Sequence, residues 1–118
     1  MKIIIAGGRT FNDYNKLCSY CNHILQNQQV IEIVSGVANG ADLLGERYAR
    51  EKGYLIKQFP ANWDNGKSAG YIRNEEMAKY SDALIAFWDG SSKGTGHMIN
   101  LAKIYNLKIR IYYYGKDN

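Results

Sequence analysis

Three short glycine-rich segments carry the residues that could do chemistry in this sequence, and they lie at positions 7–10, 35–40 and 89–95. Glycine lets a ligand approach the backbone closely, and the hydroxyls of Thr10, Ser35, Ser92 and Thr95 add hydrogen-bond donors. A helix follows each segment in the pattern described below, so its first N–H groups and the positive end of its dipole favour a negative charge. One such segment would be only a tight turn, but three together predict an anion site, most simply for phosphate or pyrophosphate.

Charged and amide side chains stand beside these segments. Arg9 follows the first glycine pair, where a guanidinium can form paired hydrogen bonds with a phosphate or a carboxylate. Arg73 and Asn74 open a later helix at a spacing that turns both toward the first segment, with Met77 turned inward. Asp42 begins the helix after the second segment, and two roles stay open for it: capping that helix, or accepting a hydrogen bond from a ligand hydroxyl.

Two common nucleotide-binding signatures are absent. The sequence contains no G-x-x-x-x-G-K-[ST] run, and its first glycine segment is not G-x-G-x-x-G. Neither a P-loop nucleotide hydrolase nor a standard NAD-dependent enzyme is therefore predicted.

The elements that must position these residues alternate along the chain. Continuous apolar runs predict strands at 2–6, 30–34, 54–59, 83–88 and 107–113. Helical spacing of apolar residues predicts helices at 13–28, 40–52, 71–80 and 95–105, with a polar loop that holds Trp63 at 61–70. Apolar strands that alternate with helices indicate a mainly parallel five-stranded sheet in a three-layer α/β/α sandwich. All three glycine segments then lie at the carboxyl edge of the sheet, where such folds bind ligands.

Length and composition exclude several classes. The 118 residues predict a single domain at 1–114 with a polar tail at 115–118, and the net charge of +4 comes without a basic block. No run approaches the ~18 apolar residues of a membrane span, and the first apolar run is too short for a secretory signal, so we expect a cytoplasmic protein without membrane contact. Cys18 and Cys21 lie inside a predicted helix, which favours packing over redox chemistry, and with His23 they lack a second ligand pair for a metal.

Five ordered blocks carry a family resemblance. They are G-G-R-x-F at 7–11, S-G-x-A-x-G-A-D at 35–42, F-P-A-x-W at 59–63, A-G-x-x-R-N-x-x-M at 69–77 and F-W-D-G-x-S-x-G-T at 87–95. With these blocks the sequence, from about residue 2 to residue 112, resembles the YspA, or cpYpsA-related, branch of the SLOG superfamily, which is related to the DprA and LOG proteins. The resemblance implies a Rossmann-like fold that binds nucleotides or ADP-ribose-type signals at the strand ends, and a homodimer or larger homo-oligomer.

The matching blocks also imply which residues bind the ligand. They are Gly8, Arg9, Thr10, Ser35, Gly36, Gly40, Asp42, Arg73, Asn74, Asp89, Ser92, Gly94 and Thr95. One departure bears on chemistry, because the LOG enzymes end the motif P-G-G-x-G-T-x-x-E with a catalytic glutamate. Met98 occupies that position here, and a thioether cannot transfer a proton or stabilise an oxocarbenium ion. Hydrolase activity is therefore disfavoured, and no catalytic residue is assigned.

The expected function is to bind a phosphorylated nucleoside-type small ligand, a nucleotide or an ADP-ribose derivative, as a stand-alone sensor or a ligand-sequestering protein in nucleotide signalling. No cofactor and no metal are expected. Trp63 or Trp88 could stack on a base, although Trp88 continues an apolar strand. One alternative is a phosphoribohydrolase-like enzyme that cleaves an N-glycosidic bond. A second alternative is single-stranded nucleic-acid binding as in DprA, which the modest charge and the lack of a basic stripe disfavour.

Overall fold

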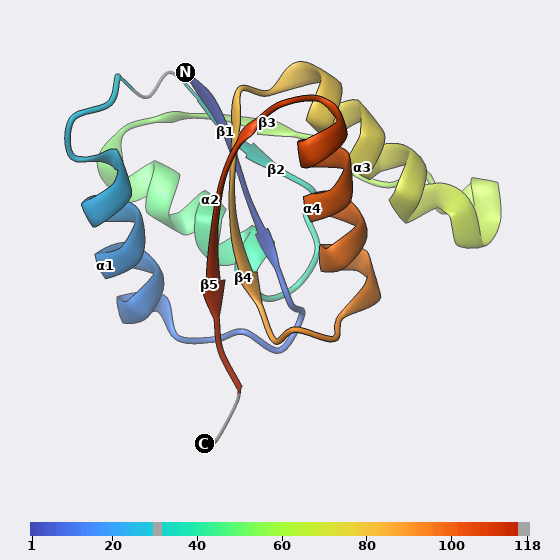
Figure 1. Ribbon diagram of the computed structural model, residues 1–118, viewed down its shortest axis with the longest axis horizontal. Helices are drawn as coiled ribbons and strands as arrows, with labels where there is room; N and C mark the ends of the chain where they lie inside the picture. The colour runs from blue at the N-terminus through green and yellow to red at the C-terminus, as the bar shows by residue number, and fades with distance from the viewer. Residues whose placement is uncertain (30–31, 116–118) are drawn as a thin grey trace.

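The computed structural model describes residues 1–29 and 32–115 and confirms the predicted fold class. The elements run in the order β1 (Lys2–Gly7), α1 (Tyr14–Leu25), β2 (Glu32–Ser35), α2 (Ala41–Lys52), β3 (Leu55–Gln58), a 3-10 helix η1 (Trp63–Ser68), α3 (Ala69–Tyr80), β4 (Ala83–Trp88), α4 (Lys93–Ile104) and β5 (Lys108–Tyr113). Within the described residues, five parallel strands form one sheet in the order β3-β2-β1-β4-β5 (Figure 1).

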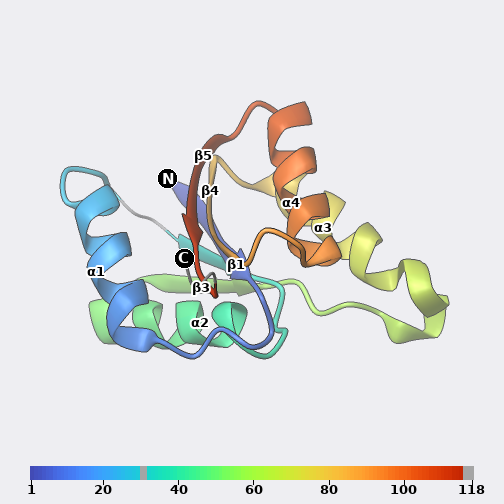
Figure 2. The ribbon, with the colours of Figure 1, turned by 60° about the horizontal axis from the view of Figure 1, so that its bottom comes forward.

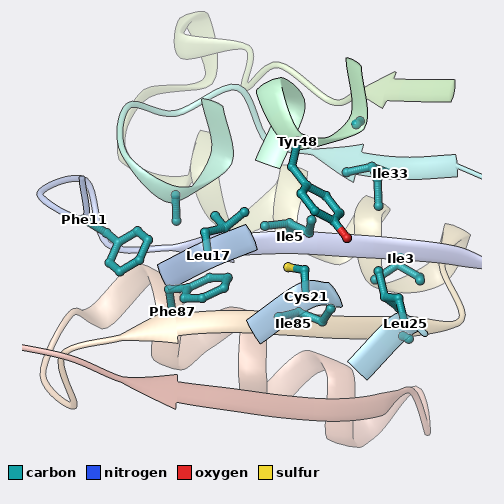
Figure 3. Packing of buried hydrophobic residues seen from close by; sticks show 13 residues of the cluster. Ile3, Ile5, Phe11, Leu17, Cys21, Leu25, Ile33, Tyr48, Ile85 and Phe87 are labelled. Atoms are coloured by element: carbon teal, nitrogen blue, oxygen red, sulfur yellow. The ribbon is translucent and has the colours of Figure 1, made fainter. Parts of the chain in front are cut away.

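The sheet is the middle of three layers. Helices α1 and α2 cover one face and α3 and α4 cover the other (Figure 2). Alternate residues of β1 point to opposite faces, so Ile3 and Ile5 join the core under α1 and α2, whereas Ile4 joins the core under α3 and α4. Leu17 of α1 and Tyr48 of α2 close the first of these cores (Figure 3). This burial on both faces explains why the central strands are continuous apolar runs.

The order of the strands places a crevice at the centre of the sheet. From β1 the chain adds β2 and β3 on one side, then crosses to β4 and β5 on the other. The connections that leave β1 and β4 therefore turn to opposite faces, and a ligand crevice forms at such a switch point in an open α/β sheet. The turns after β1, β2 and β4 all emerge at the same end, at the bottom of Figure 1.

The loop predicted at 61–70 is partly wrong. Residues Trp63–Ser68 form the 3-10 helix η1, and α3 begins at Ala69 instead of residue 71. The side chain of Asn62 caps η1 by accepting a hydrogen bond from the Asp64 amide at 3.2 Å, and Gly66 interrupts it with φ = 72°. Local hydrogen bonds of this kind form a 3-10 helix in a polar segment. The sequence therefore lacks the apolar periodicity from which a helix would be predicted.

The predicted bounds of other elements differ at their ends. Helix α1 stops at Leu25, three residues before the predicted end, and the edge strand β3 is shorter and largely exposed. Residues 30–31 of the predicted second strand lie outside the described part of the chain, as do residues 116–118 of the predicted tail. Among the helices of residues 1–29 and 32–115, none has the length and apolar character needed to cross a membrane.

Candidate anion-binding cleft

A cleft of about 360 Å³ opens at the carboxyl ends of β1 and β4, and most of the predicted ligand-binding residues line it. Those that do are Gly8, Arg9, Thr10, Asp42, Arg73, Asn74, Asp89, Ser92, Gly94 and Thr95. The turn after β1 contributes the first three, α2 and α3 contribute the next three, and the remainder come from the turn after β4 and the start of α4. The topology thus brings together side chains from segments far apart in the sequence.

Three predicted residues do not line this cleft. Gly36 lines a neighbouring hollow instead. Ser35 is fully buried, and its Oγ accepts a hydrogen bond from the Val37 amide at 3.1 Å, so it shapes the turn after β2. Gly40 has φ = 82°, and a Cβ there would lie 2.3 Å from the carbonyl oxygen of Gly8. Ser35 therefore shapes the second turn, and Gly40 lets that turn pack closely against the first.

The backbone of the first turn is already engaged. The Gly8 amide donates to the carbonyl of Phe87 at 3.0 Å, and the Gly8 carbonyl accepts from the amides of Phe11 and Ala41. A Cβ on Gly8 would lie 1.8 Å from the Oη of Tyr114, so glycine is required for the packing of that tyrosine. The Gly8 amide is therefore not a free donor, although Gly8 lines the cleft.

After β4, some backbone amides form hydrogen bonds within the protein, and others remain unpaired beside the cleft. Asp89 Oδ1 accepts hydrogen bonds from the amides of Ser91 and Ser92 at 2.9 and 2.7 Å, and these bonds lower the pKa of Asp89. Helix α4 then begins without a side-chain cap. Its first amides have no partner within the helix, and Gly94 and Thr95 line the cleft, so this helix end supplies the free donors.

Two guanidinium groups share one wall of the cleft. Arg73 donates through Nη1 to the carbonyl oxygen of Gly36 and through Nε to Oδ1 of Asn74 at 3.0 Å. Burial lowers the pKa of Arg73, Asp42 opposes that effect, and the nearby charge of Arg9 lowers the pKa further. Arg9 is exposed, and the described residues offer its side chain no hydrogen bond or ion pair. Each arginine therefore keeps N–H donors for a ligand.

Asp42 is the buried carboxyl group of the cleft, with 5% of its surface exposed. Its Oδ2 accepts a hydrogen bond from the Ala38 amide at 3.2 Å, which holds the turn after β2 in place. Burial raises the pKa of Asp42 to about 6, although the Ala38 hydrogen bond and the Arg73 charge act in the opposite direction. Asp42 thus helps to shape the turn after β2, and a small part of its surface lines the cleft.

Asn74 links α3 to α4. Because Arg73 Nε donates to Asn74 Oδ1, the Asn74 amide nitrogen faces the other way, toward the Gly94 carbonyl at 3.3 Å and the His97 Nδ1 at 3.2 Å. Asn74 therefore orients Arg73 and the start of α4. His97 stands behind Asn74 with its ring 4.3 Å from that of Tyr71, and burial lowers the pKa of His97.

The position of the LOG catalytic glutamate holds an apolar side chain. Met98 and Met77 both line the cleft and are 1% exposed. The carboxyl groups among the described lining residues are Asp42 and Asp89, and backbone amides already bond to both. General acid catalysis of glycosidic cleavage needs a carboxyl group poised to release a proton to the leaving group, and Met98 cannot do this.

A family model described as YAcAr, the YspA, cpYpsA-related SLOG family, matches residues 1–66. The chain belongs to this family. The match confirms the predicted resemblance and includes the first two turns with Arg9 and Asp42, whereas Arg73 and Asp89 lie beyond it. No curated protein matches the chain. SLOG membership points to the binding or processing of a nucleotide-related ligand.

Cys21 packs in the core, whereas Cys18 is only partly buried. Cys21 is fully buried in the core under α1, and burial raises the pKa of its thiol to about 12. Redox chemistry needs a thiolate, so a thiol with this pKa is a poor candidate.

The two tryptophans differ in exposure. Trp88 is half-buried, and its indole N–H donates to the Ser92 carbonyl at 3.0 Å, whereas Trp63 is 60% exposed on η1.

Proposed function

We propose that the cleft binds a phosphorylated nucleoside-type small molecule, a nucleotide or an ADP-ribose derivative, and that the protein acts as a sensor or a sequestering protein for it. The observation that carries this proposal is the pairing of Arg9 and Arg73 on one wall, beside the uncapped start of α4. Two nearby cations repel each other, and within the described residues neither Arg9 nor Arg73 forms an ion pair with a carboxyl group. A bound phosphate would relieve this repulsion.

The rest of the lining suits the remainder of such a ligand. The amides of Gly94 and Thr95 would donate to phosphate oxygens alongside the two guanidinium groups. Asp89 uses Oδ1 for the backbone, and its second oxygen would accept a hydrogen bond from a ribose hydroxyl. The thioether side chains of Met77 and Met98 offer an apolar, polarizable surface to a sugar or a base.

Calorimetric titration with AMP, ADP and ADP-ribose tests the proposal, with Arg9→Ala as the diagnostic variant. We expect at least one ligand to bind, and we expect Arg9→Ala to weaken it by about ten- to a hundred-fold, as loss of a charge-assisted hydrogen bond does. Arg110→Ala is the matched control, because Arg110 is exposed on β5 and lines a different hollow, near Met1. Absence of binding by all three ligands, or equal losses in the two variants, would contradict the proposal.

A further inference from the structure

A second hollow, of about 410 Å³, adjoins the cleft. Its lining shares Arg9, Ala38 and Arg73 with the cleft, so the two arginines stand at the boundary between the two spaces. The other side of the second hollow is built by the turn after β2 and by the segment that follows β3, including Pro60 and Trp63. Together the two spaces offer a larger volume than either offers alone, and the positive charges of Arg9 and Arg73 lie between them.

Trp63 gives the second hollow a flat aromatic wall. Its side chain is 60% exposed, and within the described residues its ring stacks on no other aromatic ring. The 3-10 helix that carries it projects past the end of the sheet (Figure 2). An exposed tryptophan beside a hollow is an expected feature of a site that stacks on a planar ring.

The Trp63 ring and the Arg73 guanidinium group both lie beside Gly70. A Cβ on Gly70 would lie 3.7 Å from Arg73 Nη2 and 3.9 Å from Trp63 Cη2, so the indole ring and the cation are both close to that position. A Cβ on Gly36 would lie 2.9 Å from Arg73 Nη1. A ligand whose phosphate sits at Arg73 is therefore within reach of the Trp63 ring.

We propose that the ligand spans both spaces, with its phosphate or pyrophosphate group at Arg9 and Arg73, an aromatic base on Trp63, and a second nucleoside or sugar in the cleft. This inference rests on the proposed function and specifies the ligand class, which is a two-part molecule joined through phosphate. The geometry carries it, because the cations lie at the boundary of the two spaces. A mononucleotide extends from its phosphate in one direction and fills only one of them.

Titration with AMP, ADP and diadenosine diphosphate, in which a pyrophosphate joins two adenosines, tests the inference. We expect diadenosine diphosphate to bind about five- to 150-fold more tightly than ADP, the range that stacking of one base on an aromatic ring supplies. Trp63→Ala should weaken the binding of diadenosine diphosphate by a factor in the same range, and Trp63→Phe should retain most of the affinity. Ile104→Ala is the control, because Ile104 is 69% exposed on α4 and lines neither space.

Each outcome of this titration decides between the two proposals. If ADP binds but diadenosine diphosphate binds no more tightly, the two-part ligand is wrong and the proposed function stands. If Trp63→Ala binds diadenosine diphosphate as tightly as the wild type does, the assigned role of Trp63 is wrong. If no phosphorylated nucleoside binds, both proposals fail. Quenching of tryptophan fluorescence by diadenosine diphosphate, present in the wild-type protein and much reduced in Trp63→Phe, is the independent readout that supports stacking, and equal quenching in both refutes it.

Discussion

Replacement of Asp42 by asparagine tests the electrostatic description of the cleft. Burial raises the pKa of Asp42 to about 6 in the folded protein from the usual 3.8, so the folded state binds a proton more tightly than the unfolded state. The contribution of Asp42 to stability is then largest at low pH and falls as pH rises from about 4 to about 7, with little further change above that. The full difference corresponds to about 3 kcal/mol, since each pKa unit is worth about 1.4 kcal/mol.

Urea unfolding of the wild-type protein and Asp42→Asn at several pH values measures this effect. Other carboxyl groups also titrate, so the informative quantity is the difference in the free energy of unfolding between the two proteins. We expect the variant to gain about 2 kcal/mol relative to the wild type between pH 4 and pH 7, because the unfolded aspartate is already more than half ionised at pH 4. Asp89→Asn is the contrasting control, because the pKa of Asp89 is lowered and its stabilisation is lost as pH falls. A difference between the wild type and Asp42→Asn that stays constant over this range would refute the reasoning.

Two further predictions concern the packing of the turns. Gly8→Ala should lower the free energy of unfolding by about 1–3 kcal/mol, because its Cβ would overlap the Tyr114 hydroxyl. Tyr114→Phe removes that hydroxyl, which is buried without a partner, so it should cost little alone and should recover much of the loss in the double variant; additive effects would contradict this. Gly40→Ala should also cost about 1–3 kcal/mol, because φ is 82° and the Gly8 carbonyl lies in the way; an unchanged thermal midpoint would contradict it.

Much of the fold followed from local pattern in the sequence. Short apolar runs such as Ala83–Trp88 predicted buried strands, and the observed strand has the same bounds. The left-handed Gly53 ends α2 where the sequence placed a stop. Such features depend on the few residues that form them, because a strand or a helix end is set by side-chain period and backbone freedom. The convergence of the three glycine segments on one edge also followed, once the strands were taken as parallel.

Only the tertiary structure determines which hydrogen-bonding groups remain free to bind a ligand. The sequence does not show that the Phe87 carbonyl accepts a hydrogen bond from the Gly8 amide, or that the Gly36 carbonyl accepts one from Arg73. It also does not show that the Asp89 carboxylate accepts hydrogen bonds from the amides after β4. Nor does it show that Trp63 borders a second hollow beside the two arginines. Except for the local bonds of Asp89, these contacts join residues far apart in the chain, and they depend on strand order and on which donors the packed backbone leaves unpaired.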